Sequence, residues 1–225
     1  MSVSDNLKRI KSTLPKNVKL VAVSKFHSAE DVIECIKAGQ NVFGENKIQE
    51  AAQKFDYIRS LGFTPELYII GQLQRNKVKQ AVRIASMIQS VDRVELVEEI
   101  EKQCSLQNKT IQILFEIHTA EDSKSGFTDL NELFELLDGF EKRFPHIKIK
   151  GFMTMAPFTD DKNLIENSFK KIKELQNKAK ENFPSLDFSE LSMGMSNDYK
   201  IAIENGSTMV RIGTAIFGER NYGSK

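Results

Sequence analysis

The sequence LSMGMSNDYKIAIENGSTMVRIGTAIFG, residues 191–218, contains two short apolar runs separated by a helical pattern. The first run ends in the turn MGMSND, and the second, MVRIGT, occupies residues 209–214. Ser196 stands before the helical pattern as an N-cap would, and Gly206 marks its end. A near-continuous apolar strand, a helix and another such strand are typical of a parallel sheet covered by helices. This stretch therefore predicts an α/β fold.

The same alternation runs through the rest of the chain. The other predicted strands are LVAVSK (20–25), VFGEN (42–46), ELYIIG (66–71), SMIQSVD (86–92), IQILFEIH (111–118) and IKIKGFMTMA (147–156). Together with residues 190–195 and 209–214 they make eight strands, and eight parallel strands favour a closed barrel over an open sheet. Ser28 and Asp92 are predicted helix caps, and Gly39 is a predicted helix end. A further helix is predicted from Val3 to Thr13.

No linker or low-complexity block divides the chain. Its 225 residues, of which 40% are hydrophobic, suit one sizeable core. We therefore expect one domain over residues 1–225, a (β/α)8 TIM barrel with an extra N-terminal helix.

Composition argues against several classes of protein. Lys and Arg number 32 against 31 Asp and Glu, so the net charge of +1 leaves no broad basic field for nucleic acid. No run approaches the ~18 apolar residues of a membrane span, and the start MSVSDNLKRIKS lacks a signal-peptide core. Cys35 and Cys104 form no Cys-x-x-Cys pair, and His27, His118 and His146 lack metal-ligand spacing. We expect a cytoplasmic protein that contains no disulfide and no metal site.

Polar residues gather at the ends of the predicted strands. In barrels of this class the active site lies at the C-terminal ends of the strands. The strand ends carry Lys25, Glu45 with Asn46, the MGMSND turn, and Arg211 with Gly213 and Thr214. We therefore expect the functional site at this end of the barrel.

Lys25 is the first candidate at that end. Alternation of side chains places Lys25 and Arg211 facing inward on strands that are neighbours in a closed barrel. Desolvation and the nearby positive charge both favour a neutral amine, which is the nucleophile of Schiff-base chemistry. The alternative is a structural lysine that extends from a strand end towards solvent.

The loops after the last two strands suit a phosphate group. Ser196 would begin a helix whose free N–H groups attract an anion. Gly213 allows close approach to the backbone, and Thr214 supplies a hydroxyl donor. The alternative needs no ligand: Ser196 could be present only as a helix cap, and Gly213 only for close packing. Their placement near Lys25 favours a phosphorylated aldehyde or ketone.

The motifs LVAVSK, AGQNVFGENKIQE, YIIGQLQRNK, EDSKSG, GFMTMAP and the stretch from residue 191 to residue 218 match one known family. The chain resembles the pyridoxal phosphate homeostasis proteins of the YggS/PROSC type, across most of its length. That family is similar to the barrel domain of fold-type III pyridoxal phosphate enzymes such as alanine racemase. The resemblance implies this barrel and pyridoxal 5′-phosphate as cofactor.

The resemblance also implies roles for individual residues. Lys25 would form the internal aldimine, and Arg211 would face the pyridine nitrogen, which a donor-only guanidinium keeps unprotonated. The other implied pocket residues are Ser196, Gly213 and Thr214 at the phosphate, Ser192 beside them, and Asn46 in the wall. Two features depart from the family pattern: Lys47 replaces a frequent Tyr, and SKFHSA replaces the usual S-K-T-K. Lys124, in EDSKSG, is a candidate second docking lysine.

Three functions remain open from the sequence. The favoured one is a monomeric carrier that binds, buffers or delivers pyridoxal phosphate without substantial turnover, with apo pyridoxal phosphate enzymes as candidate recipients. The second is a racemase-like enzyme, for which only residues 221–225 follow Arg220 where alanine racemases continue into a domain that supplies a catalytic Tyr. The third is a Schiff-base aldolase acting on a sugar phosphate.

Overall fold

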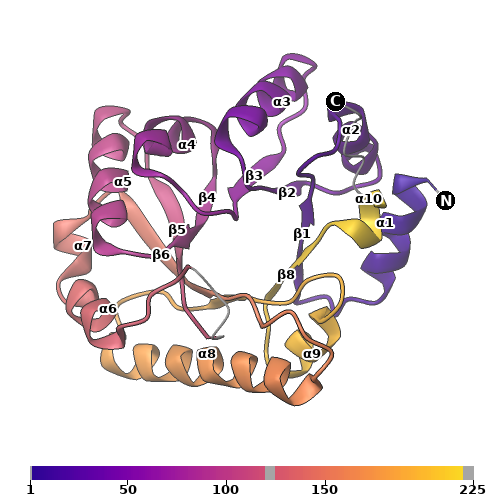
Figure 1. Cartoon of the computed structure of the whole chain (residues 1–225). Helices are drawn as coiled ribbons and strands as arrows, with labels where there is room; N and C mark the ends of the chain where they lie inside the picture. The colour runs from indigo at the N-terminus through magenta and orange to yellow at the C-terminus, as the bar shows by residue number, and fades with distance from the viewer. Residues whose placement is uncertain (1, 120–124, 220–225) are drawn as a thin grey trace.

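The eight predicted strands close into one parallel barrel in the computed structural model, which describes residues 2–119 and 125–219 (Figure 1). The strands are β1 (Lys19–Val23), β2 (Val42–Glu45), β3 (Glu66–Ile69), β4 (Met87–Val91), β5 (Ile111–Glu116), β6 (Ile147–Met153), β7 (Glu190–Ser192) and β8 (Met209–Ile212). Each pairs with its sequence neighbours, and β8 pairs with β1. The predicted (β/α)8 barrel is confirmed. The strands end earlier than predicted, so most of the polar residues assigned to strand ends lie in the loops that follow.

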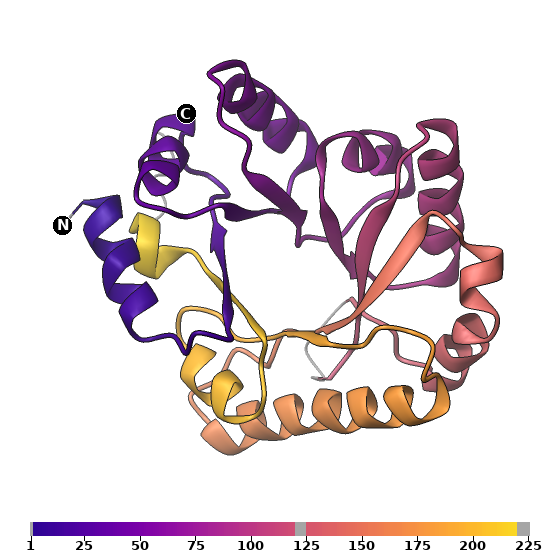
Figure 2. The same cartoon turned by 180° about the vertical axis from the view of Figure 1, so that it is seen from behind.

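Helices surround the barrel on the outside, as the two opposite views show (Figures 1 and 2). They are α1 (Val3–Ser12), α2 (Ala29–Lys37), α3 (Ile48–Ser60), α4 (Val78–Ile84), α5 (Val94–Leu106), α6 (Leu130–Leu137), α7 (Phe140–Arg143), α8 (Lys162–Asn182), α9 (Tyr199–Glu204) and α10 (Thr214–Phe217), with a 3-10 turn at Arg75–Lys77. The predicted N-terminal helix is α1, which packs against α10 and α2. Among the described residues, no helix combines the length and apolar character needed to cross a bilayer.

Local sequence signals explain some helix starts and fail at others. Ser28 and Asp31 exchange side-chain to backbone hydrogen bonds at 3.1 and 3.2 Å, which is the capping box that starts α2. The prediction that Asp92 caps a helix is wrong. The Asp92 carboxylate instead pairs with Arg93, and Arg93 takes the N-cap position of α5. An acidic side chain beside a basic one has a stronger partner than a backbone N–H.

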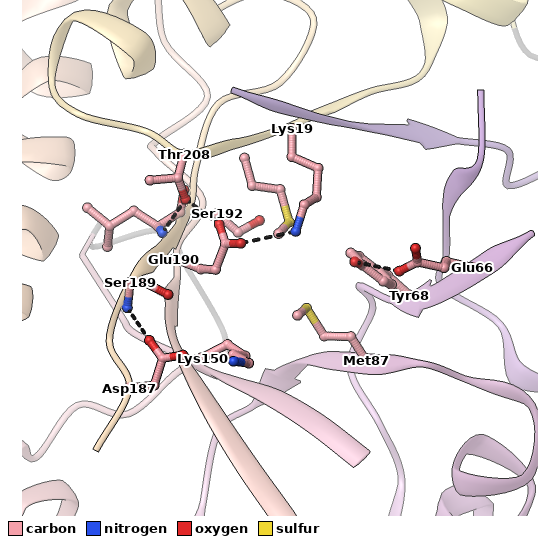
Figure 3. A network of polar contacts seen from close by, with 12 residues as sticks. Lys19, Glu66, Tyr68, Met87, Lys150, Asp187, Ser189, Glu190, Ser192 and Thr208 are labelled. Carbon is pink, nitrogen blue, oxygen red and sulfur yellow. Dashed lines mark hydrogen bonds and ion pairs between the residues drawn. The ribbon is translucent and has the colours of Figure 1, made fainter. Parts of the chain in front are cut away.

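The barrel interior is filled at its N-terminal end. A cluster of buried side chains occupies the middle: Val21, Tyr68, Met87, Leu114, Met153 and Met209. Towards the N-terminal end, Lys19 forms an ion pair with Glu190 at 3.0 Å, and the Thr208 hydroxyl donates to Glu190 at 2.5 Å (Figure 3). The Tyr68 hydroxyl donates to the Glu66 carboxylate at 3.0 Å. Closure of this end leaves the opposite end of the barrel for a ligand.

Gly151 allows β6 and β7 to approach each other closely. The register between β5 and β6 shifts at this point, where Ile113 pairs with Ile149 but Leu114 pairs with Gly151. Gly151 has φ of 140°, and a Cβ atom there would lie 1.9 Å from the Glu190 carbonyl oxygen. Only glycine fits this irregularity without moving a strand.

We predict that Gly151→Ala lowers the free energy of unfolding by about 3 kcal/mol, because the backbone conformation and the contact with Glu190 are both unfavourable for a side chain. Urea unfolding measures the loss. Gly139→Ala is the control, since Gly139 also has positive φ, 61°, but no atom within 4 Å of the added carbon. Its expected cost is about 1 kcal/mol. Equal losses in the two variants would contradict the role given to the Glu190 contact.

Candidate cofactor site

A cavity of about 840 Å³ opens at the C-terminal end of the barrel. Among the described residues, its wall draws on the C-terminal ends of every strand except β4 and on the loops after them. Six of the seven residues predicted for the site line it: Lys25, Asn46, Ser196, Arg211, Gly213 and Thr214. The structure thus brings together side chains separated by up to 189 positions along the chain, from Lys25 to Thr214 (214 minus 25).

Lys25 lies in a tight turn beyond the end of β1, and not on the strand as predicted. The Ser24 carbonyl accepts a hydrogen bond from the His27 N–H at 3.1 Å, which makes Lys25 the second residue of a four-residue turn. Phe26, the third residue, has φ of 68°, a region that glycine usually occupies. The turn places Lys25 at the cavity wall.

Arg211 forms part of the cavity floor and is only 4% exposed. Its Nη1 donates to the Ser192 carbonyl at 2.7 Å and to the Ser192 hydroxyl at 2.8 Å, and its Nη2 donates to the Thr154 carbonyl at 2.8 Å. Burial lowers the pKa of the guanidinium to about 10, and the charges of Asp198 and Glu116 act in the opposite direction. Arg211 therefore stays charged near neutral pH, and three hydrogen bonds fix its orientation.

Ser192 is the one predicted site residue that does not line the cavity. The side chain is fully buried, and its hydroxyl donates to the Gln89 Oε1 at 2.7 Å while accepting from Arg211. Gln89 extends the same interior chain, with its Nε2 2.9 Å from the Met209 sulfur. Ser192 supports Arg211 from inside the barrel.

The loop after β7 differs from its predicted form. Helix α9 begins at Tyr199 and has Asp198, not Ser196, at its N-cap position. The Asp198 carboxylate turns back to accept the Met195 N–H at 2.5 Å, and burial raises the pKa of Asp198. Ser196 lies in the intervening turn, where it lines the cavity without capping the helix. The short carboxylate bond across the turn delays the start of the helix.

The loop after β8 packs directly against β1. A Cβ atom on Gly213 would lie 3.1 Å from the Val23 carbonyl oxygen and 3.3 Å from the Val23 Cβ. Gly213 therefore serves close packing between the two strands as well as facing the cavity. Thr214 is exposed, begins α10 and lines the cavity.

Five titratable residues of the cavity wall are not among the predicted site residues: His27, Glu116, Asp160, Lys162 and Asp198. His27, considered above only as a metal ligand, lines the cavity, stacks on Phe217 with ring centroids 4.9 Å apart, and has its Nδ1 3.9 Å from Asp31. Glu116, at the end of β5, accepts from the Ser125 hydroxyl at 2.5 Å. Burial raises its pKa, and Asp92 adds to the shift. A signal was present for Glu116, because it is an acidic residue at the end of an apolar strand.

The cavity mouth carries the loop after β6, with Met155 and the 96% exposed Phe158.

Lys47 takes the N-cap position of α3, pairs with Glu50 at 2.8 Å, and lies over the Phe26 ring at 5.3 Å. Lys124 lies outside the described residues. Within the described residues, no group of three or more His, Cys, Asp or Glu side chains is arranged to hold a metal ion.

The site combines an amine, a buried cation and polar loops at one end of a barrel. A lysine amine condenses with a carbonyl group, and a guanidinium donates to a ring nitrogen or an anion. The loops after β7 and β8 correspond to the position where this fold commonly binds phosphate. The arrangement suits a small phosphorylated carbonyl compound.

Comparison with known proteins agrees with this assignment. Residues 2–221 match the family model for the N-terminal domain of alanine racemase. The pyridoxal phosphate homeostasis protein of Pasteurella multocida is 36% identical, over 99% of both chains. That of Mus musculus is 37% identical, over 92% of this chain and 78% of the relative.

Solved structures extend the comparison to three dimensions. PipY of Synechococcus elongatus with pyridoxal phosphate bound has a TM-score of 0.90 and 30% identity, covering 96% of this chain and all of PipY. Alanine racemase of Bacillus anthracis has a TM-score of 0.75 and 18% identity, over 97% of this chain and 56% of the racemase. The latter likeness shows the shared barrel alone. The chain belongs to the family of pyridoxal phosphate homeostasis proteins, which share the barrel of the alanine racemase N-terminal domain.

Proposed function

We propose that this protein binds pyridoxal 5′-phosphate as an imine on Lys25, and that it stores and delivers the cofactor without substantial turnover of amino acids. The observation that carries the proposal is the convergence of Lys25, Arg211 and the loops after β7 and β8 on one cavity. The names of its relatives and the ligand bound by PipY support it.

The residues present fit this cofactor. When bound, pyridoxal phosphate supplies a reactive aldehyde and an aromatic ring that withdraws electrons. Lys25 contributes the amine, and Ser196, Gly213 and Thr214 contribute hydroxyl and backbone groups at the expected phosphate position, with Asn46 in the wall. The cavity volume lies within the range of small-molecule sites, so it has room for the whole cofactor.

Arg211 argues for a carrier. Its guanidinium only donates, so it would leave a ring nitrogen facing it unprotonated and weaken the ring as an electron sink. The Ser192 and Thr154 carbonyls accept hydrogen bonds from the guanidinium, and its pKa of about 10 keeps it charged near neutral pH. Carbanion chemistry, which racemisation requires, is less favourable beside such a group.

The tyrosines support the same conclusion. Tyr57 is half exposed on α3, Tyr68 lies near the closed end of the barrel, and the Tyr199 hydroxyl bonds to Thr13 at 3.1 Å. None of these three lines the cavity, while Tyr222 lies outside the described residues. A tyrosine acid placed as in alanine racemase is therefore lacking within the described part of the site.

Location and assembly belong to the same proposal. We infer a cytoplasmic monomer that exchanges cofactor with apo pyridoxal phosphate enzymes. Cys35 and Cys104 are free and buried, and burial raises the pKa of their thiols to about 12 and about 11. Unreactive, unpaired thiols suit a reducing compartment.

The first prediction is that Lys25→Ala abolishes the imine absorbance of the loaded protein and leaves the fold intact, because Lys25 lies in a loop above the packed barrel. Borohydride reduction followed by peptide mapping identifies the labelled lysine in the wild type. Lys162→Ala is the matched control, since Lys162 also lines the cavity and its loss should leave the imine unchanged. Label on a lysine other than Lys25 would contradict the assignment. A purified, colourless wild type that forms no imine with added pyridoxal phosphate would favour the aldolase alternative.

The second prediction concerns the phosphate. Thr214→Val removes one hydroxyl at the same volume and should weaken pyridoxal phosphate about tenfold, because a hydrogen bond to a charged group is lost. Affinity for unphosphorylated pyridoxal should not change. Thr214 is preferred to Gly213 for this test, since a side chain on Gly213 would disturb Val23. Thr159→Val, in the loop after β6, is the control for a lost hydroxyl in the same cavity. If Thr214→Val weakened both ligands equally, Thr214 would not be a phosphate-binding residue.

The third prediction is that the loaded protein turns over amino acids negligibly but reactivates an apo pyridoxal phosphate enzyme. Incubation with several L-amino acids and assays for D-isomer and keto acid measure turnover, with an alanine racemase as positive control. Reactivation is compared with the rate of spontaneous cofactor release. Product formation that depends on Lys25 would make the protein an enzyme.

A further inference from the structure

The turn that carries Lys25 is anchored at its first residue, Ser24. The Ser24 N–H donates to the Gly44 carbonyl at 3.1 Å, and the Ser24 hydroxyl donates to the Glu45 Oε1 at 2.8 Å. The Ser24 carbonyl accepts from the Lys54 Nζ at 2.8 Å, in addition to the His27 N–H. Every polar group of this fully buried residue is therefore bonded.

Two of these bonds come from one buried ion pair. Lys54 Nζ lies 2.8 Å from the Glu45 Oε1, and the side chains are 12% and 1% exposed. Glu45 ends β2, and Lys54 reaches across from the middle of α3, so the pair connects β1, β2 and α3 directly behind Lys25. Neither side chain lines the cavity.

Stability alone is a weak reason for such a pair. Two charges lose their hydration when they are buried, and apolar side chains of similar size often stabilise a core as well or better. The pair instead holds the Ser24 backbone beside a turn whose third residue, Phe26, adopts a left-handed conformation that is unfavourable for a side chain. A turn of this kind persists only where its surroundings hold it.

We propose that Glu45 and Lys54 are positioning residues for Lys25: together they fix the hydroxyl and carbonyl of Ser24, and so fix the direction in which Lys25 enters the cavity. The inference rests on the proposed imine of Lys25. The pair acts through the Ser24 to His27 turn and does not contact the ligand.

The test measures how fast Lys25 reacts. The main variant is the double substitution Lys54→Met with Glu45→Gln, which leaves no unpaired buried charge and keeps an oxygen acceptor for Ser24. Imine formation after mixing with pyridoxal phosphate is followed by absorbance, with borohydride labelling to confirm Lys25. Equilibrium binding of pyridoxine 5′-phosphate, which has an alcohol in place of the aldehyde, reports the cavity without the imine. Lys54→Arg keeps the charge and the donor.

The control is the ion pair Lys19–Glu190, which closes the opposite end of the barrel (Figure 3). Lys19→Met with Glu190→Gln also removes a pair that connects strands, but far from the turn. Thermal unfolding of both double variants identifies losses of global stability.

Slower imine formation, by at least about tenfold, is expected for the Glu45 and Lys54 double variant, because small displacements of a reacting group cost up to about a hundredfold in rate. Affinity for pyridoxine 5′-phosphate should be unchanged, the Lys19 and Glu190 variant should react as the wild type, and Lys54→Arg should retain most of the rate. A wild-type rate in the double variant, or a parallel loss of pyridoxine 5′-phosphate affinity, would overturn the positioning role. Absence of an imine in the wild type would instead refute the proposed function.

Discussion

The burial of one guanidinium inside the barrel organises the site. Arg211 retains its charge because carbonyl and hydroxyl groups replace the water it has lost, and because Asp198 and Glu116 lie close enough to favour the charged form. These partners come from β5, β7 and the loops after β6 and β7. The interior chain from Gln89 through Ser192 extends the support to β4. Buried polar groups from several strands thus converge on one side chain.

The two ends of the barrel divide structural and functional roles. The N-terminal end is closed by the ion pair between Lys19 and Glu190 and by the hydrogen bond from Thr208, which join β1, β7 and the residue before β8. The C-terminal end holds the cavity, whose wall is built largely from the loops that follow the strands. Because the closed N-terminal end stabilises the barrel, the loops at the C-terminal end can differ in chemistry while the strands keep them in place.

Retention and release of a cofactor place opposite demands on such a site. A carrier needs a lysine that reacts reversibly, and a ring environment that does not promote further chemistry. In the proposed function, Arg211 meets the second demand through its fixed charge, and the anchored turn of Lys25 meets the first. Phe158 and Met155, in the loop after β6, add exposed apolar surface to the cavity wall.

The sequence by itself determined the eight strands, the helices between them, the parallel barrel and the end of the barrel that carries the site, because apolar periodicity and strand-end polarity are local properties. It also identified six residues that line the cavity. Only the tertiary structure decided that Ser192 supports Arg211 from below, that Asp198 displaces Ser196 from the helix start, and that Glu45 and Lys54 hold the turn of Lys25. Depth within a barrel and hydrogen-bond partners depend on the register between strands and on helices distant in sequence, which no local pattern contains.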